Sequence, residues 1–81
     1  MSVVKVRIDG SERTATEAMH GNKFVHLLLP EGEGLVARKV PLRGYKPRVL
    51  DYPPERAKRH YRRIARTRGA TKQAKALLRN I

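Results

Sequence analysis

Four arginines within eight residues, Arg59, Arg62, Arg63 and Arg66, are the side chains of this sequence best suited to bind a ligand. At about 100° per residue of an α-helix, all four fall on the same side of the helix. A guanidinium group donates paired hydrogen bonds that match the oxygens of a phosphate or the edge of a guanine. The spacing therefore predicts a helix face that binds phosphate groups.

A second set of basic residues follows at helical spacing. Lys72, Lys75 and Arg79 group on one side of a predicted second helix, opposite its apolar residues. Ammonium and guanidinium groups on neighbouring helices can contact the same polyanion. We predict that these three side chains extend the binding surface of the arginine face.

A smaller basic group surrounds a turn that contains glycine and proline. Arg43, Lys46 and Arg48 lie within six residues and could follow a groove of a nucleic acid. Tyr45 lies between them and is the one aromatic residue expected to contact a base or a sugar. The chain has only three Tyr and one Phe, too few for the stacking surface on which proteins bind single strands.

The charge of the chain is concentrated after Glu55. Residues 56–81 hold ten Lys and Arg and no Asp or Glu, whereas residues 1–55 hold nine basic and seven acidic side chains. A helix surface that is merely solvated mixes the two signs, because like charges at i,i+4 repel each other. A polyanionic partner removes that repulsion, so the distribution predicts binding to nucleic acid, with duplex DNA slightly ahead of structured RNA.

Two alternatives share the same electrostatics. The protein could be associated with the ribosome or another folded RNA, or it could be a small adaptor or inhibitor whose basic helices dock on an acidic protein surface. All three classes of partner present negative charge, and charge alone does not separate them.

Residues for catalysis or for metal binding are not grouped in this sequence. His20, His26 and His60 lack the spacing of metal ligands, and there is no cysteine. Cleavage of RNA by His20 or His26 with the help of basic residues is chemically feasible. A phosphate-binding glycine loop is not expected, because Gly32 and Gly34 sit among glutamates, which repel an anion. We therefore expect a protein that is not an enzyme and that uses no metal or cofactor.

The first 52 residues carry the pattern of an antiparallel sheet. Val4, Val6 and Ile8 alternate with charged residues, and Asp9-Gly10 predicts a tight turn to a return strand at 12–19. Further strands are predicted at 23–29 and 35–42, joined by the loop 30–34. Residues 48–52 could add a short fifth strand or simply connect the sheet to the helices. The expected architecture is a four- or five-stranded meander or small barrel.

Residues 53–81 have the period of two amphipathic helices. In the first, Ala57, Tyr61, Ile64 and Ala65 form an apolar stripe, and Asp51 can act as the N-cap or as a local turn residue. We expect this helix to end at Gly69, which favours the left-handed conformation.

The second helix is expected to begin after Thr71 as N-cap. Its apolar stripe consists of Ala74, Leu77, Leu78 and Ile81. An unbroken helix would rotate the two stripes by about 130° from each other. A bend at 68–70 would let both reach the sheet, and the alternative is that Leu77, Leu78 and Ile81 form a homodimer contact.

The chain is therefore expected to fold as one α+β domain over residues 1–81. Its 81 residues are enough for one small core, in which we expect Phe24 and Tyr61. The N-terminus lacks the apolar run of a signal peptide, and no segment approaches the roughly 20 apolar residues of a membrane span. We expect a cytoplasmic protein that does not bind membranes.

Overall fold

The computed structural model describes residues 2–81, with every side chain among them except that of Pro54. It confirms the α+β fold: five antiparallel strands precede two helices. The elements are β1 (Val3–Ile8), β2 (Ser11–His20), β3 (Phe24–Glu31), β4 (Gly34–Pro41), β5 (Arg48–Val49), α1 (Pro54–Thr67) and α2 (Lys72–Arg79).

The strands are arranged in the order β4-β3-β2-β1-β5. The first four follow one another as a meander, and β5 then returns to the opposite side of β1, where Val49 pairs with Val4. The predicted fifth strand is therefore real but only two residues long. The proline expected to limit pairing, Pro41, lies at the end of the edge strand β4.

Two short turns hold the meander in register. Asp9 and Gly10 have positive φ angles of 51° and 81°, as the predicted turn between β1 and β2 requires. Gly32, with φ 59°, opens the two-residue turn between β3 and β4. The return strand β2 is longer than its weak β-propensity indicated, because it pairs with a neighbour on each side.

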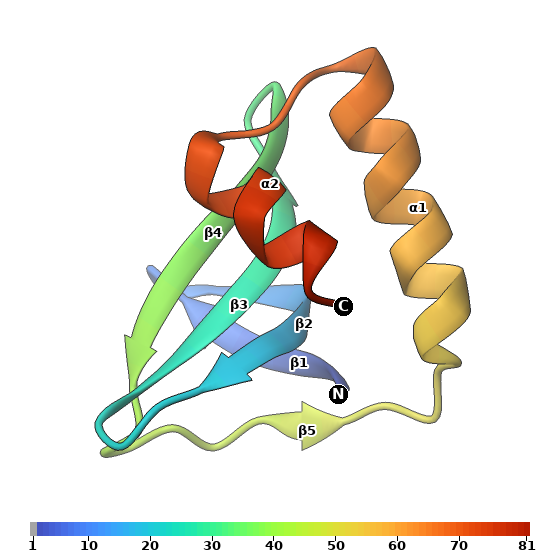
Figure 1. Cartoon of the computed structure of the whole chain (residues 1–81). Helices are drawn as coiled ribbons and strands as arrows, with labels where there is room; N and C mark the ends of the chain where they lie inside the picture. The colour runs from blue at the N-terminus through green and yellow to red at the C-terminus, as the bar shows by residue number, and fades with distance from the viewer. Residues whose placement is uncertain (1) are drawn as a thin grey trace.

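The sheet is strongly twisted (Figure 1). It carries apolar side chains on both faces. On the face away from the helices, Val4, Val6, Leu27 and Leu29 form a buried cluster, against which Tyr45 of the segment after β4 also packs. The other face packs against both helices through Val3, Leu28 and Leu35. Both helices therefore depend on the same side of the sheet for their position.

The apolar stripes of the two helices both reach this helix-facing side. Ala57, Tyr61 and Ile64 of α1 are buried there, as are Ala74 and Leu77 of α2. Leu78 and Ile81, which the alternative assigned to a homodimer contact, pack partly buried against the same cluster within the chain.

Of the two aromatic residues expected in the core, only Tyr61 is there. Tyr61 is only 3% exposed, but Phe24 belongs to neither buried cluster and is half-buried at the start of β3. The ammonium group of Lys39 lies 4.3 Å from the centre of its ring. Phe24 therefore stays partly exposed at the end of an inner strand and contributes a cation–π contact.

The prediction that Asp51 caps α1 is wrong. The N-cap is Pro53, in an extended conformation with φ −61° and ψ 127°, and no side chain caps the helix. The residue before a proline is pushed out of the helical region, so Pro53 cannot be helical and the helix starts at Pro54. Asp51 then lies too early to reach the first free amide groups.

The linker between the helices pairs with the sheet. Gly69 adopts φ 96°, as predicted, and the hydroxyl of Thr71 accepts a hydrogen bond from the amide of Ala74 at 3.2 Å to cap α2. The amide of Leu35 donates to the carbonyl of Gly69, and the amide of Thr71 donates to the carbonyl of Leu35, each at 3.1 Å. The turn between the helices is thereby fixed against β4 in a parallel bridge at Ala70.

We expect Gly34→Ala to destabilise the protein, because a Cβ at Gly34 would lie 2.5 Å from the carbonyl oxygen of Gly69. The linker must shift away from β4 to make room, which we expect to cost about 1–3 kcal/mol of unfolding free energy. Urea denaturation measures this loss. The exposed neighbour Glu33→Ala serves as the control and should change stability by less than about 0.5 kcal/mol. Equal stability of the two variants would contradict the close contact.

Candidate nucleic-acid interface

The arginine face of α1, formed by Arg59, Arg62, Arg63 and Arg66, is exposed over its whole length. All four side chains lie on the side of the helix opposite the buried Ala57, Tyr61 and Ile64. The helix has 14 residues and is therefore about 21 Å long. Figure 1 shows it along one side of the molecule, with its outer surface free of other elements.

A buried hydrogen bond fixes the rotation of α1 on the sheet. The hydroxyl of Thr16 in β2 donates to the phenol oxygen of Tyr61 at 2.9 Å, and both residues are almost fully buried. Burial raises the pKa of Tyr61, so the phenol stays neutral at physiological pH. With Tyr61 held inward, the four arginines lie about 100–160° around the helix axis from it and face outward.

The basic side chains of the helices differ from those of the sheet in their ion pairs. Among the described residues, no carboxylate lies within 4.0 Å of a basic side chain of α1 or α2. The sheet behaves differently: Arg38 lies 2.6 Å from Asp9 and 3.0 Å from Glu31. The uncompensated charge therefore belongs to the helices.

The basic side chains of α2 are also exposed. Lys72, Lys75 and Arg79 lie away from the buried Ala74 and Leu77, as the periodicity predicted. No acidic residue lies in the first turn of α2. Because α1 and α2 pack on the same buried cluster, each helix turns its basic face away from that cluster.

The second basic group lies at the β1–β5 edge of the sheet, apart from the core beneath the helices. Arg43, Lys46 and Arg48 are exposed there, and two strand residues that the sequence analysis did not include, Lys5 and Arg7, join them around shallow pockets of about 240 Å³. The pairing of Lys5 with Arg48 across β1 and β5 brings these segments together. The strand order, which places β5 beside β1, adds Lys5 and Arg7 to the three residues predicted from the sequence.

Tyr45 is held in the fold by a hydrogen bond and by apolar packing. Its hydroxyl donates a hydrogen bond to Glu17 Oε2 at 2.7 Å. Its ring packs partly buried against the cluster that contains Val6, on the face of the sheet away from the helices. Burial, followed by the hydrogen bond and the negative charge of Glu17, raises the pKa of Tyr45. The predicted contact of this residue with a base or sugar would have to use the edge of the ring left exposed.

We expect Tyr45 to make stability dependent on pH in the alkaline range. Folding favours its neutral phenol, so this contribution is complete below the ordinary pKa of 10.0 and is lost as the pH rises above it. Unfolding free energies measured between pH of about 8 and about 11 should fall more steeply for the wild type than for Tyr45→Phe. Parallel curves for the two proteins would contradict the role assigned to this hydroxyl.

Arg56, His60 and Tyr52 lie beside the arginine face, and the sequence analysis did not include them. Together with Arg59 and Arg63 they line a pocket of about 350 Å³ beside the first half of α1. The guanidinium carbon of Arg56 lies 5.3 Å from the ring centre of Tyr52. The helical spacing of residues 56, 59, 60 and 63 could have predicted that they lie on one side of α1. The approach of Tyr52 to these residues depends on the path of the chain after β5.

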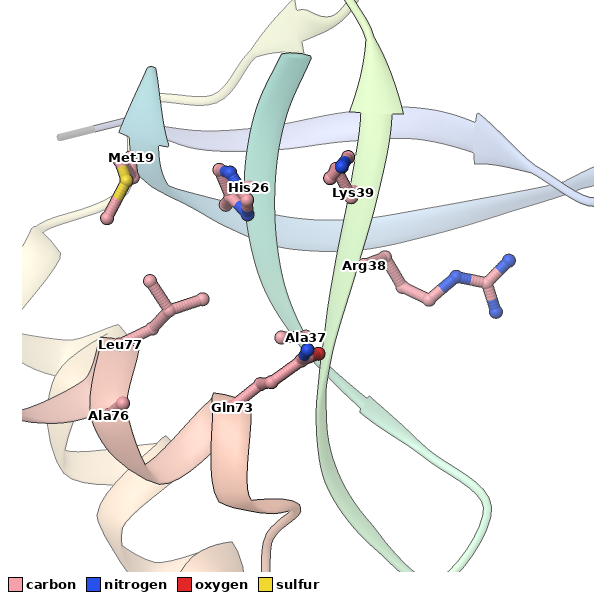
Figure 2. Close-up of a pocket in the computed structure, with 8 residues that line it drawn as sticks. All are labelled: Met19, His26, Ala37, Arg38, Lys39, Gln73, Ala76 and Leu77. Atoms are coloured by element: carbon pink, nitrogen blue, oxygen red, sulfur yellow. The ribbon is translucent and has the colours of Figure 1, made fainter. Parts of the chain in front are cut away.

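A different hollow lies between α2 and the sheet. Figure 2 shows Met19 and Leu77 directed into this space of about 290 Å³, while the guanidinium group of Arg38 points away from it. Met19 is 45% exposed. The lining is mainly apolar, so this hollow does not add to the basic surface.

The histidines are dispersed over the structure. His20 lies 3.5 Å from Glu17, His26 lines the hollow beside α2, and His60 lines the pocket beside α1. Within residues 2–81, no group of three or more His, Cys, Asp or Glu side chains is arranged to hold a metal ion. Over the same residues, neither helix has the length and apolar character needed to span a membrane.

The chain was compared with known proteins at three levels. Protein-family models, curated proteins and solved structures gave no match to the chain. The residues and the geometry described above are therefore the basis for assigning a function.

Proposed function

We propose that this protein is a small non-enzymatic nucleic-acid-binding protein that holds the phosphate backbone with the arginine face of α1. The observation that carries the proposal is the row of four exposed guanidinium groups without an acidic partner within 4.0 Å among the described residues. Their mutual repulsion raises the energy of the free protein and is relieved when phosphates bind. Lys72, Lys75 and Arg79 of α2 add further contacts.

The shape of α1 favours duplex DNA over structured RNA. The major groove of B-DNA is wide enough to admit an α-helix, whereas that of A-form RNA is deep and too narrow for side chains to read. The outer surface of α1 is unobstructed, and its arginines lie on the face that would meet the groove. The cytoplasm is the proposed compartment for this interaction.

The salt dependence of binding tests the proposal. With about five phosphate contacts, the logarithm of the association constant should fall against the logarithm of salt concentration with a slope of about −4 to −5. Fluorescence anisotropy with duplex DNA, duplex RNA and an acidic protein, at physiological salt and below, measures both the slope and the preference. A slope near zero with both nucleic acids would refute phosphate binding, and tighter binding to the acidic protein would favour the adaptor function.

A further inference from the structure

The pocket beside the first half of α1 adjoins a second hollow beneath it. The outer pocket, of about 350 Å³, is lined by Tyr52, Arg56, Arg59, His60 and Arg63. The inner hollow, of about 200 Å³, lies between α1 and the sheet and shares Tyr52 and His60 with the outer pocket. Together the two spaces fall within the range of about 300–1,000 Å³ that is usual for ligand sites.

The outer pocket is built to receive an anion. Arg56, Arg59 and Arg63 follow one another at i, i+3 and i+7, so their guanidinium groups border the same hollow. No carboxylate among the described residues lines it. Arginine donates hydrogen bonds in a planar fork that fits phosphate oxygens, and three arginines carry more charge than one phosphodiester can balance. A terminal phosphate, with a charge of about −1.5 to −2 at neutral pH, balances them better.

The inner hollow has a different chemistry. Its walls include Val3, Pro30 and Ala57 together with the rings of Tyr52 and Tyr61, and the exposed Thr14 stands among the lining residues. An aromatic and aliphatic lining of this kind suits a planar nucleobase, and the hydroxyl of Thr14 and the imidazole of His60 can bond to its polar edge. The contact of Arg56 with the ring of Tyr52 orients that ring at the boundary of the two spaces.

We infer that this double pocket binds a nucleotide with a terminal phosphate, with the phosphate held by Arg56, Arg59 and Arg63 and the base in the inner hollow. The inference rests on the proposed function, because a 5′-phosphorylated strand end is the form in which a nucleic acid presents this group. At a strand end the base also unstacks at the lowest cost. A free nucleoside monophosphate has the same chemistry and is the other source that must be tested.

The test compares short DNA duplexes that carry a 5′ overhang ending in a phosphate or in a hydroxyl. We expect the wild type to bind the phosphorylated end about tenfold more tightly, which is the gain usual for added hydrogen bonds to a charged group. Arg56→Gln should reduce this preference to less than about twofold. The matched control is Arg62→Gln, which removes the same charge from α1 outside the pocket; it should weaken both duplexes and preserve their ratio.

The outcomes separate this inference from the proposed function. Equal binding of the two duplexes by the wild type, or equal loss of the preference in the two variants, would overturn the pocket and leave backbone binding intact. Failure to bind either duplex would overturn both. A duplex whose phosphorylated terminal nucleotide lacks its base should bind more weakly than the intact one, and equal binding would exclude the inner hollow. Displacement by adenosine monophosphate as effective as by the phosphorylated duplex would identify a free nucleotide as the ligand.

Discussion

Replacing Arg59 and Arg63 together by alanine should weaken binding to duplex DNA by about tenfold to a hundredfold, because each guanidinium group lost removes a charge-assisted contact with phosphate. The slope of the logarithm of affinity against the logarithm of salt should also become shallower by about two. Both side chains are exposed, so the unfolding free energy should change by less than about 0.5 kcal/mol. Anisotropy titrations over a series of salt concentrations measure the first two effects.

A matched control for this double variant exists on the sheet. Lys23→Ala with Lys39→Ala removes the same number of positive charges from exposed positions outside the helices. We expect this control to lower affinity by less than about twofold, through the change in net charge alone. If both double variants bound DNA with the same affinity, the binding surface would not be the arginine face of α1.

Deleting residues 69–81 should lower the melting temperature by about 10–25 °C. Leu77 is buried against the helix-facing side of the sheet, and full burial of one such side chain is worth about 1.5–3 kcal/mol. The deletion also uncovers Leu28 and Leu35 and removes the hydrogen bonds between Leu35 and the linker. In a domain of this size, 1 kcal/mol corresponds to about 4–8 °C. Differential scanning calorimetry measures the shift.

The control for the deletion retains the core and removes only the charge. In the triple variant Lys72→Gln, Lys75→Gln and Arg79→Gln, the exposed basic side chains of α2 become neutral while Ala74 and Leu77 stay in place. Its melting temperature should stay within about 4 °C of the wild type, and its affinity for DNA should fall. An unchanged melting temperature in the deletion would show that α2 does not stabilise the sheet.

Much of the fold could be predicted because local rules and tertiary packing agree over most of the chain. The Asp9-Gly10 turn, the alternation in β1 and the two helical stripes each specify one local geometry, and the structure has all of them. Gly69 and Thr71 end one helix and start the next for the same reason. The error at Asp51 arose where two successive prolines set the helix start more strongly than a capping side chain.

Features that depend on long-range contacts could not be predicted. Helical periodicity shows which arginines of α1 share a face, but the pocket also needs Tyr52, whose position is set by the pairing of β5 with β1. Lys5 joins the second basic group for the same reason. Phe24 was expected in the core from its apolar character alone, yet its place at the start of an outer strand pair leaves it half-buried.

The pairing of the interhelical linker with β4 also affects how readily the protein aggregates. A strand at the border of a sheet offers free amide and carbonyl groups to other chains, and apolar strands of this kind initiate aggregation. Gly69 and Thr71 occupy these groups at Leu35. During synthesis, β4 is completed well before the linker emerges, so the chain passes through a stage in which this border is open to other molecules. Loosening of the linker would free the amide and carbonyl of Leu35 in the mature protein and favour aggregation through β4 without unfolding the sheet.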